Sequence, residues 1–407
     1  MSQYVVIGGG LAGAKAVETL RTEGFDGSVV LVSGEKQVPY ERPPLSKGFL
    51  LGNEAAEKAQ VHEPGWYAAH DVDLRLGTWA SGIDLAAHTV ALEGGGAVGY
   101  DRLLLATGAF PRKLAVPGAE DAPLHYLRSL ANSERLRADL QPGGRRVVVV
   151  GGGWIGLEVA AAARTYGNDV TVIEPQPAPL LAALGAEMGG VFADLHRANG
   201  VVLVLGTGVS ALERHGPSWT VVDAAGTPHE ADVVVVGVGA RPATDLAEAA
   251  GLAVDNGVVV DASLRTSDPD VFAAGDVASA YSPLLGRHLR VEHWANALHA
   301  GPAAARAMLG QEVSFDRVPY FYSDQYDLGM EFSGHPEGYA RVVTRGDVAG
   351  REFVAFWLDA ADVVLAGMNV NVWDVTDAIQ ALVRARRPVD VARLTDAGVP
   401  LGEVLGA

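Results

Sequence analysis

Two glycine-rich segments could bind the pyrophosphate of a dinucleotide. Residues 6–13 read VIGGGLAG and residues 149–156 read VVGGGWIG, and each segment follows an apolar run and precedes an Ala-rich stretch. In this motif the first glycine allows a tight turn, the second lets the backbone approach a pyrophosphate, and the third lets a helix pack on its strand. The N-terminus of that helix then faces the negative charge. The residues that we assign to these turns are Gly8, Gly10, Leu11, Ala12, Gly13, Gly151, Gly153, Trp154, Ile155 and Gly156.

An apolar run closed by an acidic residue follows each copy of the motif. The runs are residues 29–32 and 170–173, and the acids are Glu35 and Glu174. This repetition predicts two βαβ units with parallel strands. The carboxylate of Glu174 can accept hydrogen bonds from both ribose hydroxyls, but it would repel a 2′-phosphate, and residues 175–176 offer no arginine to neutralise one. The second unit is therefore predicted to prefer NADH to NADPH.

Each unit also ends on an apolar strand that runs into a glycine turn. Residues 101–112 read DRLLLATGAFPR, and residues 231–244 read ADVVVVGVGARPAT. A glycine at a strand end would let a flat ring approach the backbone, and an ordinary turn glycine is the alternative interpretation. The residues of these turns that we add to the predicted cofactor site are Ala106, Thr107, Gly108, Gly237 and Gly239.

The pattern of the chain changes twice after these units. A short strand is expected at residues 258–260, ahead of SLRTSDPDVFAAGDVA at residues 263–278. From about Pro319 onward, two strand patterns within residues 353–368 precede an amphipathic helix at residues 375–385. This last part predicts a C-terminal α+β domain.

Composition narrows the chemistry that is possible. The 407 residues exceed what one ordinary core holds, so several domains are expected. The chain has no cysteine, which excludes disulfides, thiolate metal sites and thiol relays, so we expect a bound redox cofactor and no metal site. A formal net charge of -18 opposes binding to nucleic acid. With no basic leader before the first strand and no apolar run of about 18 residues, we expect a cytoplasmic protein without a membrane span.

Seven segments of the chain, read together, carry a family resemblance. They are VIGGGLAG at residues 6–13, VPYERPPLSK at 38–47, ATGAFPR at 106–112, VVGGGWIGLE at 149–158, AAGDVA at 273–278, VEHWANA at 291–297 and PYFYSDQYD at 319–327. They resemble the FAD-dependent, NADH-specific ferredoxin reductases that serve bacterial cytochrome P450s and ring-hydroxylating dioxygenases. The resemblance implies an α/β fold like that of glutathione reductase, with two Rossmann-type dinucleotide-binding domains and a C-terminal α+β domain. The implied boundaries are residues 1–111 and 242–318 for the FAD-binding domain, 112–241 for the NAD-binding domain and 319–407 for the C-terminal domain.

Carried over position by position, the resemblance assigns residues to the flavin. Lys47 and Pro44 would lie beside the flavin ring near its reactive N5, where an ammonium group could stabilise negative charge on the reduced ring. An ordinary surface lysine is the alternative interpretation of Lys47. Arg42 and Arg128 would hold FAD, and Asp276 would bind its ribityl chain. The further cofactor-binding residues that we predict are Ala80, Gly275, Glu292 and His293.

The resemblance also assigns residues to the nicotinamide. Glu158 would lie near its amide, and Trp294 and Tyr322 would line the ring pocket, although both rings could also be ordinary core aromatics. Two positions depart from the family. Gly34 stands where the family often has an acid, so that Glu35 would bind the adenosine ribose instead, and Tyr322 stands where the family often has tryptophan. The predicted catalytic residues are Lys47, Pro44, Glu158 and Tyr322.

The implied activity is electron transfer from NADH through FAD to a small, transiently bound two-iron ferredoxin. Because that partner is usually acidic, docking would need a basic patch. The candidate residues are Arg287, Arg290, Arg384, Arg386 and Arg387. Two alternatives are an NADH oxidase or small-molecule reductase, such as a monodehydroascorbate reductase, and an NADH-sensing flavoprotein of the apoptosis-inducing type. The peroxidase and disulfide branches of this superfamily need cysteine and are excluded, and the chain would act as a monomer or a homodimer.

Overall fold

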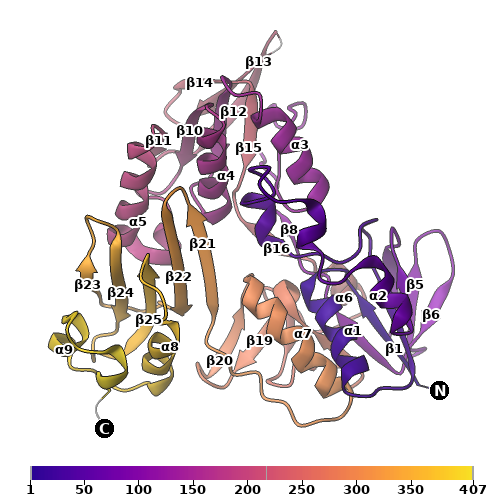
Figure 1. Cartoon of the computed structure of the whole chain (residues 1–407). Helices are drawn as coiled ribbons and strands as arrows, with labels where there is room; N and C mark the ends of the chain where they lie inside the picture. The colour runs from indigo at the N-terminus through magenta and orange to yellow at the C-terminus, as the bar shows by residue number, and fades with distance from the viewer. Residues whose placement is uncertain (1, 217, 406–407) are drawn as a thin grey trace. The chain divides into compact units, whose positions relative to one another are not determined.

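The computed structural model describes residues 2–216 and 218–405, which form two compact units. The first unit contains the described parts of Met1–Arg42, Ala56–Phe110 and Ala240–Pro319. The second unit contains the described parts of Pro43–Ala55, Pro111–Gly239 and Tyr320–Ala407. Figure 1 traces the chain from the indigo N-terminal strands to the yellow C-terminal helices. The chain leaves the first unit along β8 (Ala109–Pro111) and returns to it along β16 (Ala240–Pro242).

The first unit is built on a five-stranded parallel sheet in the order β18-β7-β1-β2-β3. The strands are β1 (Gln3–Ile7), β2 (Ser28–Val32), β3 (Val72–Arg75), β7 (Arg102–Leu105) and β18 (Val271–Ala273). The central strands β1, β2 and β7 are rich in valine, isoleucine and leucine because both faces of the sheet are buried. With α1 (Leu11–Thr22) between β1 and β2, this sheet confirms the first predicted βαβ unit.

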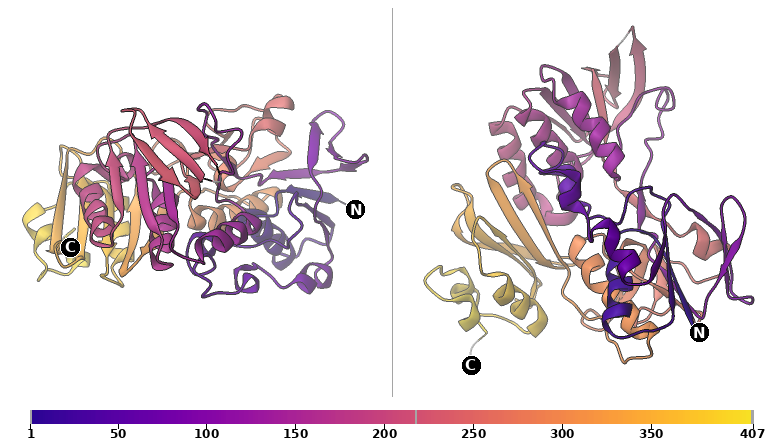
Figure 2. Two further views of the ribbon diagram at one scale, coloured as in Figure 1. Left: turned by 90° about the horizontal axis from the view of Figure 1, so that it is seen from above. Right: turned by 45° about the vertical axis from the view of Figure 1, so that its right-hand side comes forward.

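Helix α1 packs side by side with α7 (Trp294–Met308), as both Figure 1 and Figure 2 show. The two helices approach closely because Gly301 lacks a side chain: a Cβ there would lie 2.2 Å from the carbonyl oxygen of Ala12. The smaller elements of this unit are η2 (Ala56–Ala59), α2 (Pro64–Ala69), β4 (Ala80–Asp84), β5 (Thr89–Leu92), β6 (Ala97–Gly99), α6 (Asp245–Ala249), β17 (Val258–Val260), η3 (Gly275–Val277), β19 (Ala278–Ser282) and β20 (Arg287–Arg290). Strand β17 confirms the short strand expected from the sequence.

The second unit contains a four-stranded parallel sheet in the order β11-β10-β9-β15. Its strands are β9 (Arg146–Val150), β10 (Asp169–Glu174), β11 (Val202–Leu205) and β15 (Val233–Val236). Because α4 (Trp154–Thr165) joins β9 to β10, the second predicted βαβ unit is confirmed as well. Around this sheet lie α3 (Leu130–Leu140), α5 (Leu181–Ala198), β12 (Val209–His215), β13 (Ser218–Asp223) and β14 (Pro228–Ala231).

A five-stranded antiparallel sheet, in the order β21-β22-β25-β24-β23, belongs to the same second unit. Its elements and their neighbours are β21 (Tyr320–Gln325), β22 (Leu328–Gly334), β23 (Arg341–Asp347), β24 (Glu352–Leu358), β25 (Val364–Val370), α8 (Thr376–Ala385), α9 (Val391–Thr395) and η4 (Leu401–Glu403). Phe192 of α5 shares one core with Phe332 and Trp357 of this sheet, and the Trp357 indole donates to the carbonyl of Leu184 at 3.0 Å. Over the described ranges, no helix is both long and apolar enough to cross a bilayer.

Candidate functional site

The predicted site residues divide between the two units. The first unit holds Gly8, Gly10, Leu11, Ala12, Gly13, Glu35, Arg42, Ala80, Ala106, Thr107, Gly108, Gly275, Asp276, Glu292, His293 and Trp294. The second unit holds Pro44, Lys47, Arg128, Gly151, Gly153, Trp154, Ile155, Gly156, Glu158, Glu174, Gly237, Gly239 and Tyr322. Each unit therefore contributes one glycine turn at the ends of its parallel strands.

The first glycine turn, between β1 and α1, is shaped by backbone contacts. Gly8 has a φ of +124°, and a Cβ there would lie 2.0 Å from the carbonyl oxygen of Ala106 in the turn after β7. A Cβ on Gly13 would lie 2.0 Å from the carbonyl oxygen of Gly8, so that α1 starts directly on the turn. At Gly10, in contrast, no described atom beyond its chain neighbours lies within 4 Å of the Cβ position. The turn is therefore closed towards the sheet and open at the N-terminus of α1, where a pyrophosphate could bind.

Small or hydrogen-bonded residues border this turn. The Thr107 hydroxyl donates to the carbonyl oxygen of Ala243 at 2.9 Å, and Gly108 follows with a φ of +72°. On the side of η3, a Cβ on Gly275 would lie 3.1 Å from the Cβ of Ala12. The neighbouring segments thus approach the turn at distances that larger side chains would not allow.

The predicted acid of the first unit, Glu35, lies three residues beyond the end of its strand. Strand β2 ends one residue before Ser33, and a Cβ on Gly9 would lie 2.3 Å from the Ser33 hydroxyl oxygen. Glu35 instead pairs with Arg42, whose Nη2 lies 2.8 Å from the Glu35 Oε1, and it accepts a hydrogen bond from the Tyr40 hydroxyl. Glu35 thus follows the apolar run as expected, with Ser33 directly after the strand, and its role towards the adenosine ribose stays a prediction.

Gly34 lies against an exposed tryptophan. A Cβ on Gly34 would lie 2.3 Å from the Cε2 atom of Trp79, and Trp79 is 47% exposed. Ala80, which was assigned to the FAD site, begins β4 directly after this tryptophan. Any side chain at position 34 would therefore have to displace the Trp79 ring.

Arg42 and Asp276 lie within electrostatic range of each other. Burial lowers the pKa of Arg42, but neighbouring groups that include Glu35 and Asp276 raise it, and the net change is upwards. Arg290 donates to the backbone carbonyl of Asp276 at 3.3 Å and forms an ion pair with Glu292. Because the Arg290 side chain is only 11% exposed, it does not offer the free basic surface that the sequence suggested.

Three predicted residues lie at or just before the starts of helices, away from the turns. His293 is the N-cap of α7 and Trp294 is its first residue. Burial raises the pKa of Glu41, and the nearby Trp294 acts in the opposite direction. Arg128 directly precedes Ser129, the N-cap of α3. Trp294 thus belongs to the first unit, whereas Arg128 belongs to the second.

The second glycine turn, between β9 and α4, repeats the geometry of the first. Gly151 has a φ of +104°, and a Cβ there would lie 2.4 Å from the carbonyl oxygen of Gly237 in the turn after β15. A Cβ on Gly156 would lie 2.1 Å from the carbonyl oxygen of Gly151. No described atom beyond its chain neighbours lies within 4 Å of the Cβ position of Gly153, and Gly239 has a φ of +97°. This turn is also open only at the start of its helix.

Glu174 is the last residue of β10 and is bound to the glycine turn itself. Its Oε2 accepts a hydrogen bond from the backbone N–H of Gly152 at 2.6 Å, and its Oε1 accepts one from the N–H of Gln176 at 2.9 Å. Each carboxylate oxygen has a second lone pair that these bonds leave available. The carboxylate is therefore oriented at the turn and can still accept hydrogen bonds from a ribose.

The first two residues of α4 differ in their surroundings. Trp154 packs edge to face against Phe192 and Phe321, with centroid distances of 5.5 and 5.0 Å. Ile155 is 43% exposed. Of these two predicted nucleotide-binding residues, Trp154 packs against aromatic side chains of the core, whereas the side chain of Ile155 is exposed.

A buried ion pair joins two of the predicted catalytic residues. The Nζ of Lys47 lies 2.8 Å from the Oε1 of Glu158, and the two side chains are 16% and 3% exposed. The Ser323 hydroxyl donates to the same carboxylate oxygen at 2.7 Å, and the Ser46 hydroxyl donates to the other. The Lys47 ammonium lies 5.5 Å from the centroid of the Tyr322 ring. Three segments, η1 (Pro43–Ser46) with the following Lys47, α4 and β21, therefore meet at one charged centre.

Pro44 and Asp324 complete the surroundings of Lys47. Pro44 lies in η1 (Pro43–Ser46), where consecutive prolines restrict the backbone that leads to Lys47. Asp324 is exposed on its strand, but partial desolvation raises the pKa of its carboxyl group, with the Lys47 charge acting against this and Glu158 adding to it. Sequence reasoning missed Ser46, Ser323 and Asp324 as members of this centre. All three lie within recognised motifs, but nothing in those motifs distinguished them.

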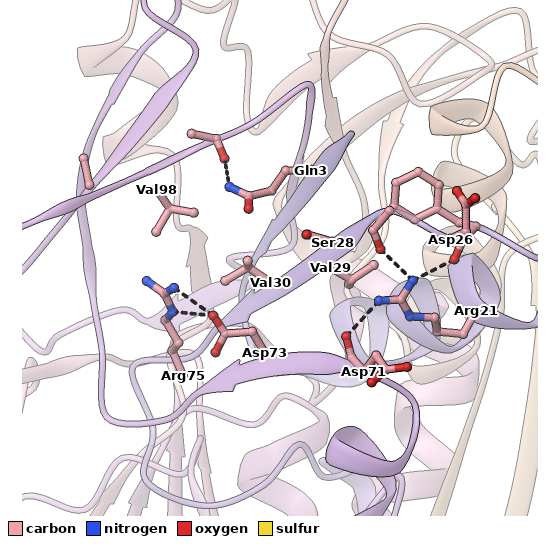
Figure 3. Close-up of a pocket in the computed structure, with 14 residues that line it drawn as sticks. Gln3, Arg21, Asp26, Ser28, Val29, Val30, Asp71, Asp73, Arg75 and Val98 are labelled. Carbon is pink, nitrogen blue, oxygen red and sulfur yellow. Dashed lines mark hydrogen bonds and ion pairs between the residues drawn. The ribbon is translucent and has the colours of Figure 1, made fainter. Parts of the chain in front are cut away.

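A separate hollow of about 700 Å³ lies in the first unit (Figure 3). Arg21 lies at its edge and donates from its guanidinium to the backbone carbonyls of Phe25, Gly27, His70 and Asp71. Asp73 and Arg75 form an ion pair nearby at 2.7 Å. Three of the charged side chains that line this hollow, Arg21, Asp73 and Arg75, are thus bound within the protein, and none of its described lining residues was predicted as a site residue.

Family comparisons cover most of the chain. Residues 2–301 match the family described as pyridine nucleotide-disulphide oxidoreductase, and residues 320–405 match the one described as reductase C-terminal. The ferredoxin–NAD(+) reductase component of the anthranilate 1,2-dioxygenase system of Burkholderia cepacia is 39% identical over 398 residues, which is 98% of each chain. The chain belongs to this reductase family.

Solved structures of the family share the fold of the present chain. A chain of the covalent putidaredoxin reductase–putidaredoxin complex superposes with a TM-score of 0.95 at 37% identity, over 99% of this chain and 98% of that one. A ferredoxin reductase from Rhodopseudomonas palustris gives 0.94 at 33% identity, over 98% and 99%. A water-forming NADH oxidase from Lactobacillus brevis gives 0.87 at 20% identity, which shows a common fold alone. The predicted fold of the reductase family is therefore confirmed.

Proposed function

We propose that the protein is an FAD-dependent reductase that carries electrons from NADH to a two-iron ferredoxin serving a cytochrome P450 or a ring-hydroxylating dioxygenase. The observation that carries this proposal is the buried Lys47–Glu158 pair in a chain that also holds two open glycine turns. Relatives named as ferredoxin–NAD(+) reductase components of the anthranilate and biphenyl dioxygenase systems support it, with 39% and 38% identity over 98% and 99% of this chain.

The two glycine turns fit the two cofactors, FAD and NADH. Each opens at the N-terminus of a 12-residue helix, and neither helix has an acidic residue in its first turn. A pyrophosphate at either position would therefore meet free N–H groups and the positive end of a helix dipole. We assign FAD to residues 1–111 and 242–318 and NADH to residues 112–241, with residues 319–407 as a C-terminal domain.

The side chains of the second unit then have distinct tasks. Glu174 accepts hydrogen bonds from the adenosine ribose of NADH and repels a 2′-phosphate. Lys47 holds an ammonium group beside the flavin, and Glu158 fixes that ammonium while one lone pair of its Oε2 stays available to the nicotinamide amide. Bound FAD accepts two electrons together as hydride and releases them singly, which is the chemistry that links NADH to a one-electron ferredoxin.

Anaerobic stopped-flow measurements test this function. We expect purified protein to bind FAD, to lose its yellow colour rapidly with NADH but slowly with NADPH, and to reduce cytochrome c faster when a two-iron ferredoxin is added. A protein that refuses added flavin would refute the proposal. Fast reoxidation by oxygen with no gain from ferredoxin would identify an NADH oxidase, and a long-lived reduced complex with an altered oligomeric state would identify an NADH sensor.

We further propose that the ferredoxin docks on the arginines at the C-terminal end of α8. Arg384, Arg386 and Arg387 are exposed, whereas Arg290 of the other candidate patch is largely buried. Reversing two charges, as in Arg386→Glu with Arg387→Glu, should raise the KM for ferredoxin several-fold at low ionic strength and less at high ionic strength, because surface charges steer association. The KM for NADH in the same samples is the internal control, and equal changes in both KM values would contradict this docking site.

Two finer expectations, a cytoplasmic location and a monomeric or homodimeric state, remain part of the proposal. Cell fractionation tests the location, and sedimentation of the flavin-loaded protein tests the oligomeric state.

A further inference from the structure

A line of polar side chains runs from Glu158 into the core of the second unit. The Ser323 hydroxyl lies 2.7 Å from the Oε1 of Glu158, and the Nε2 of Gln325 lies 3.1 Å from the Ser323 oxygen. The Nε2 of His196 lies 2.8 Å from the Oε1 of Gln325, and the Tyr326 hydroxyl lies 3.5 Å from the other ring nitrogen of His196. Ser323 and Gln325 are each 1% exposed and His196 is 0% exposed. The line therefore joins α4, β21 and α5, and its inner members Ser323, Gln325 and His196 are almost fully buried.

The direction of every hydrogen bond in this line follows from the carboxylate at its end. Ionised Glu158 can only accept, so the single O–H of Ser323 points towards it. Ser323 can then only accept from Gln325, which places the amide N–H₂ on the serine side and the amide oxygen on the histidine side. His196 must consequently carry its proton on Nε2. All donors in the line point towards Glu158.

The outer members of the line are uncharged. Burial lowers the pKa of His196, against the hydrogen bond to Gln325, so that its imidazole stays neutral in neutral solution. Burial raises the pKa of Tyr326, with the charge of Arg164 acting in the opposite direction, so that its hydroxyl keeps its proton. The line thus presents only oriented dipoles to Glu158, and a buried polar line is tolerated only when each member is satisfied.

We propose that His196, Gln325 and Ser323 are positioning residues that hold the Glu158 carboxylate in the orientation in which it meets Lys47, and that they thereby support hydride transfer from NADH. This inference rests on the proposed function of the Lys47–Glu158 pair. Gln325 and Ser323 alternate along β21 on the same face of the strand, which is why one strand can supply both steps of the line. His196 acts through them and touches neither the predicted nicotinamide site nor the flavin site.

The other charged and titratable groups around Glu158 lie on different elements. Lys47 approaches from η1, and Tyr322 and Asp324 belong to β21. Glu331 on β22 acts electrostatically on Asp324, and hydrogen bonds that include one from Thr376 lower its pKa against the effect of burial. Any measured pH profile therefore contains contributions from these groups, and the decisive comparison is between variants of the line and a matched control.

Nuclear magnetic resonance of the flavin-loaded full chain with ¹⁵N-labelled histidine tests the direction of the line without any turnover. The chain has 11 histidines, and His196→Gln identifies the signal of His196 by its loss. We expect a neutral imidazole protonated on Nε2 that does not titrate between about pH 6 and 8, and a changed Nε2 shift in Gln325→Met. A proton on Nδ1, or an imidazolium at neutral pH, would overturn the proposal.

Stopped-flow reduction of bound flavin by NADH tests the consequence. Ser323→Ala, Gln325→Met and His196→Met should each slow reduction about tenfold, the change produced by about 1.4 kcal/mol of barrier. His196→Gln, which keeps a donor for Gln325, should retain most of the wild-type rate. The matched control is Ser333→Ala on β22, since Ser333 is 2% exposed and accepts a hydrogen bond from Gln380 at 3.3 Å but has no link to Glu158.

A double variant separates positioning from a general loss of packing. Because Ser323→Ala already cuts the line next to Glu158, adding His196→Met should slow reduction little further. Independent losses that multiply, or an equal loss in Ser333→Ala, would overturn the proposal even if all variants fold. Failure of the proposed function itself would look different, because NADH would then not reduce the flavin of the wild-type chain, while the histidine spectrum would still report the line.

Discussion

The two glycine turns have the same backbone geometry but different residues at the end of the second strand. In both, a Cβ on the first glycine would meet a carbonyl oxygen of the turn after β7 or β15, at 2.0 and 2.4 Å, and a Cβ on the third glycine would meet the carbonyl oxygen of the first. After the helix, however, the first unit has Ser33 where the second has Glu174. The part that can hold a pyrophosphate is repeated, whereas the part that reads the ribose has diverged.

The contrast shows which features a binding fold can change. A backbone cradle depends on glycines that no other residue replaces, because a Cβ would meet a main-chain oxygen that cannot move without the sheet. A strand-end side chain is not part of this backbone cradle, so its replacement can alter the choice of nucleotide without moving a main-chain oxygen. A few side chains on a shared backbone structure therefore determine which nucleotide binds.

The largest effect is expected from breaking each cradle in turn. Gly8→Ala and Gly151→Ala should each destabilise their own unit by about 3 kcal/mol or more, because both combine a positive φ with a main-chain clash. Gly8→Ala should leave the protein without FAD, whereas Gly151→Ala should keep the flavin but bind NADH weakly. Flavin absorbance and NADH titration distinguish them.

A matched control for these substitutions lies in α5. Gly190 has no described atom near its Cβ position and sits within the helix, so Gly190→Ala should leave cofactor binding unchanged and stabilise the helix by up to about 1 kcal/mol. If Gly8→Ala were as well tolerated as this control, the assignment of a closed cradle would be wrong.

Substitution of the two acids, Glu174 and Glu35, should affect nucleotide binding by the two units to different degrees. Glu174→Gln should raise the KM for NADH about tenfold and reduce the preference over NADPH, since it loses charge-assisted hydrogen bonds and the repulsion of a 2′-phosphate. Glu35→Gln should weaken FAD retention less, because Glu35 is already paired with Arg42 and Tyr40. Steady-state kinetics with both nucleotides and flavin release on dilution measure the two effects. A greater loss in Glu35→Gln would reverse the roles that we assign.

A smaller effect is expected at the position where the first unit lacks an acid. Gly34→Asp should reduce FAD affinity several-fold, because its Cβ would lie 2.3 Å from the Trp79 ring. Adding Trp79→Ala should restore the affinity by removing that clash. Fluorescence titration of the flavin-free protein measures both dissociation constants, and a double variant no better than Gly34→Asp would show that the ring is not the obstacle.

The smallest effect concerns Asp101 and Asp232, the acids that directly precede β7 and β15. Asp101 accepts from the N–H of Gln3 at 2.6 Å, and Asp232 accepts from the N–H of Arg146 at 3.0 Å, but only Asp232 also pairs with a guanidinium. The hydrogen bonds of Arg146 lower the pKa of Asp232 to about 2. Asp232→Asn should therefore lose about 1 kcal/mol or less at pH 7, given the exposure of the pair.

The lowered pKa of Asp232 determines how its ion pair with Arg146 contributes to stability at different pH values. Because the folded pKa lies below the usual value of 3.8, the stabilisation is complete above about pH 4 and is lost as the pH falls towards 2. Urea unfolding at several pH values should show the wild type and Asp232→Asn converging in acid. A constant difference between them down to pH 3 would contradict the ion pair as its cause.

Local sequence patterns predicted the glycine turns and the parallel strands, whereas the side-chain contacts of the site depend on the tertiary structure. The glycine turns and their strands were predictable because one short motif fixes each of them. Glu35 was predicted as the acid that follows the first apolar run, but only the structure shows that it is paired with Arg42 and Tyr40. Lys47 and Glu158 were chosen through the family resemblance. The role of His196 could not be predicted from the sequence, because a single histidine in an apolar helix forms no recognisable motif. Its hydrogen bond to Gln325 is visible only in the structure.

The assembly of the charged centre has a consequence for the order of events on the ribosome. Ser46 and Ser323 lie 112 and 165 residues from Glu158 along the chain, and all three must be present before the carboxylate is fully bonded. A nascent chain from which only the parallel sheets have left the ribosome therefore lacks Ser323 as a partner for Glu158 until β21 has emerged. Synthesis paused shortly before that strand should leave the second unit the more sensitive of the two to proteases.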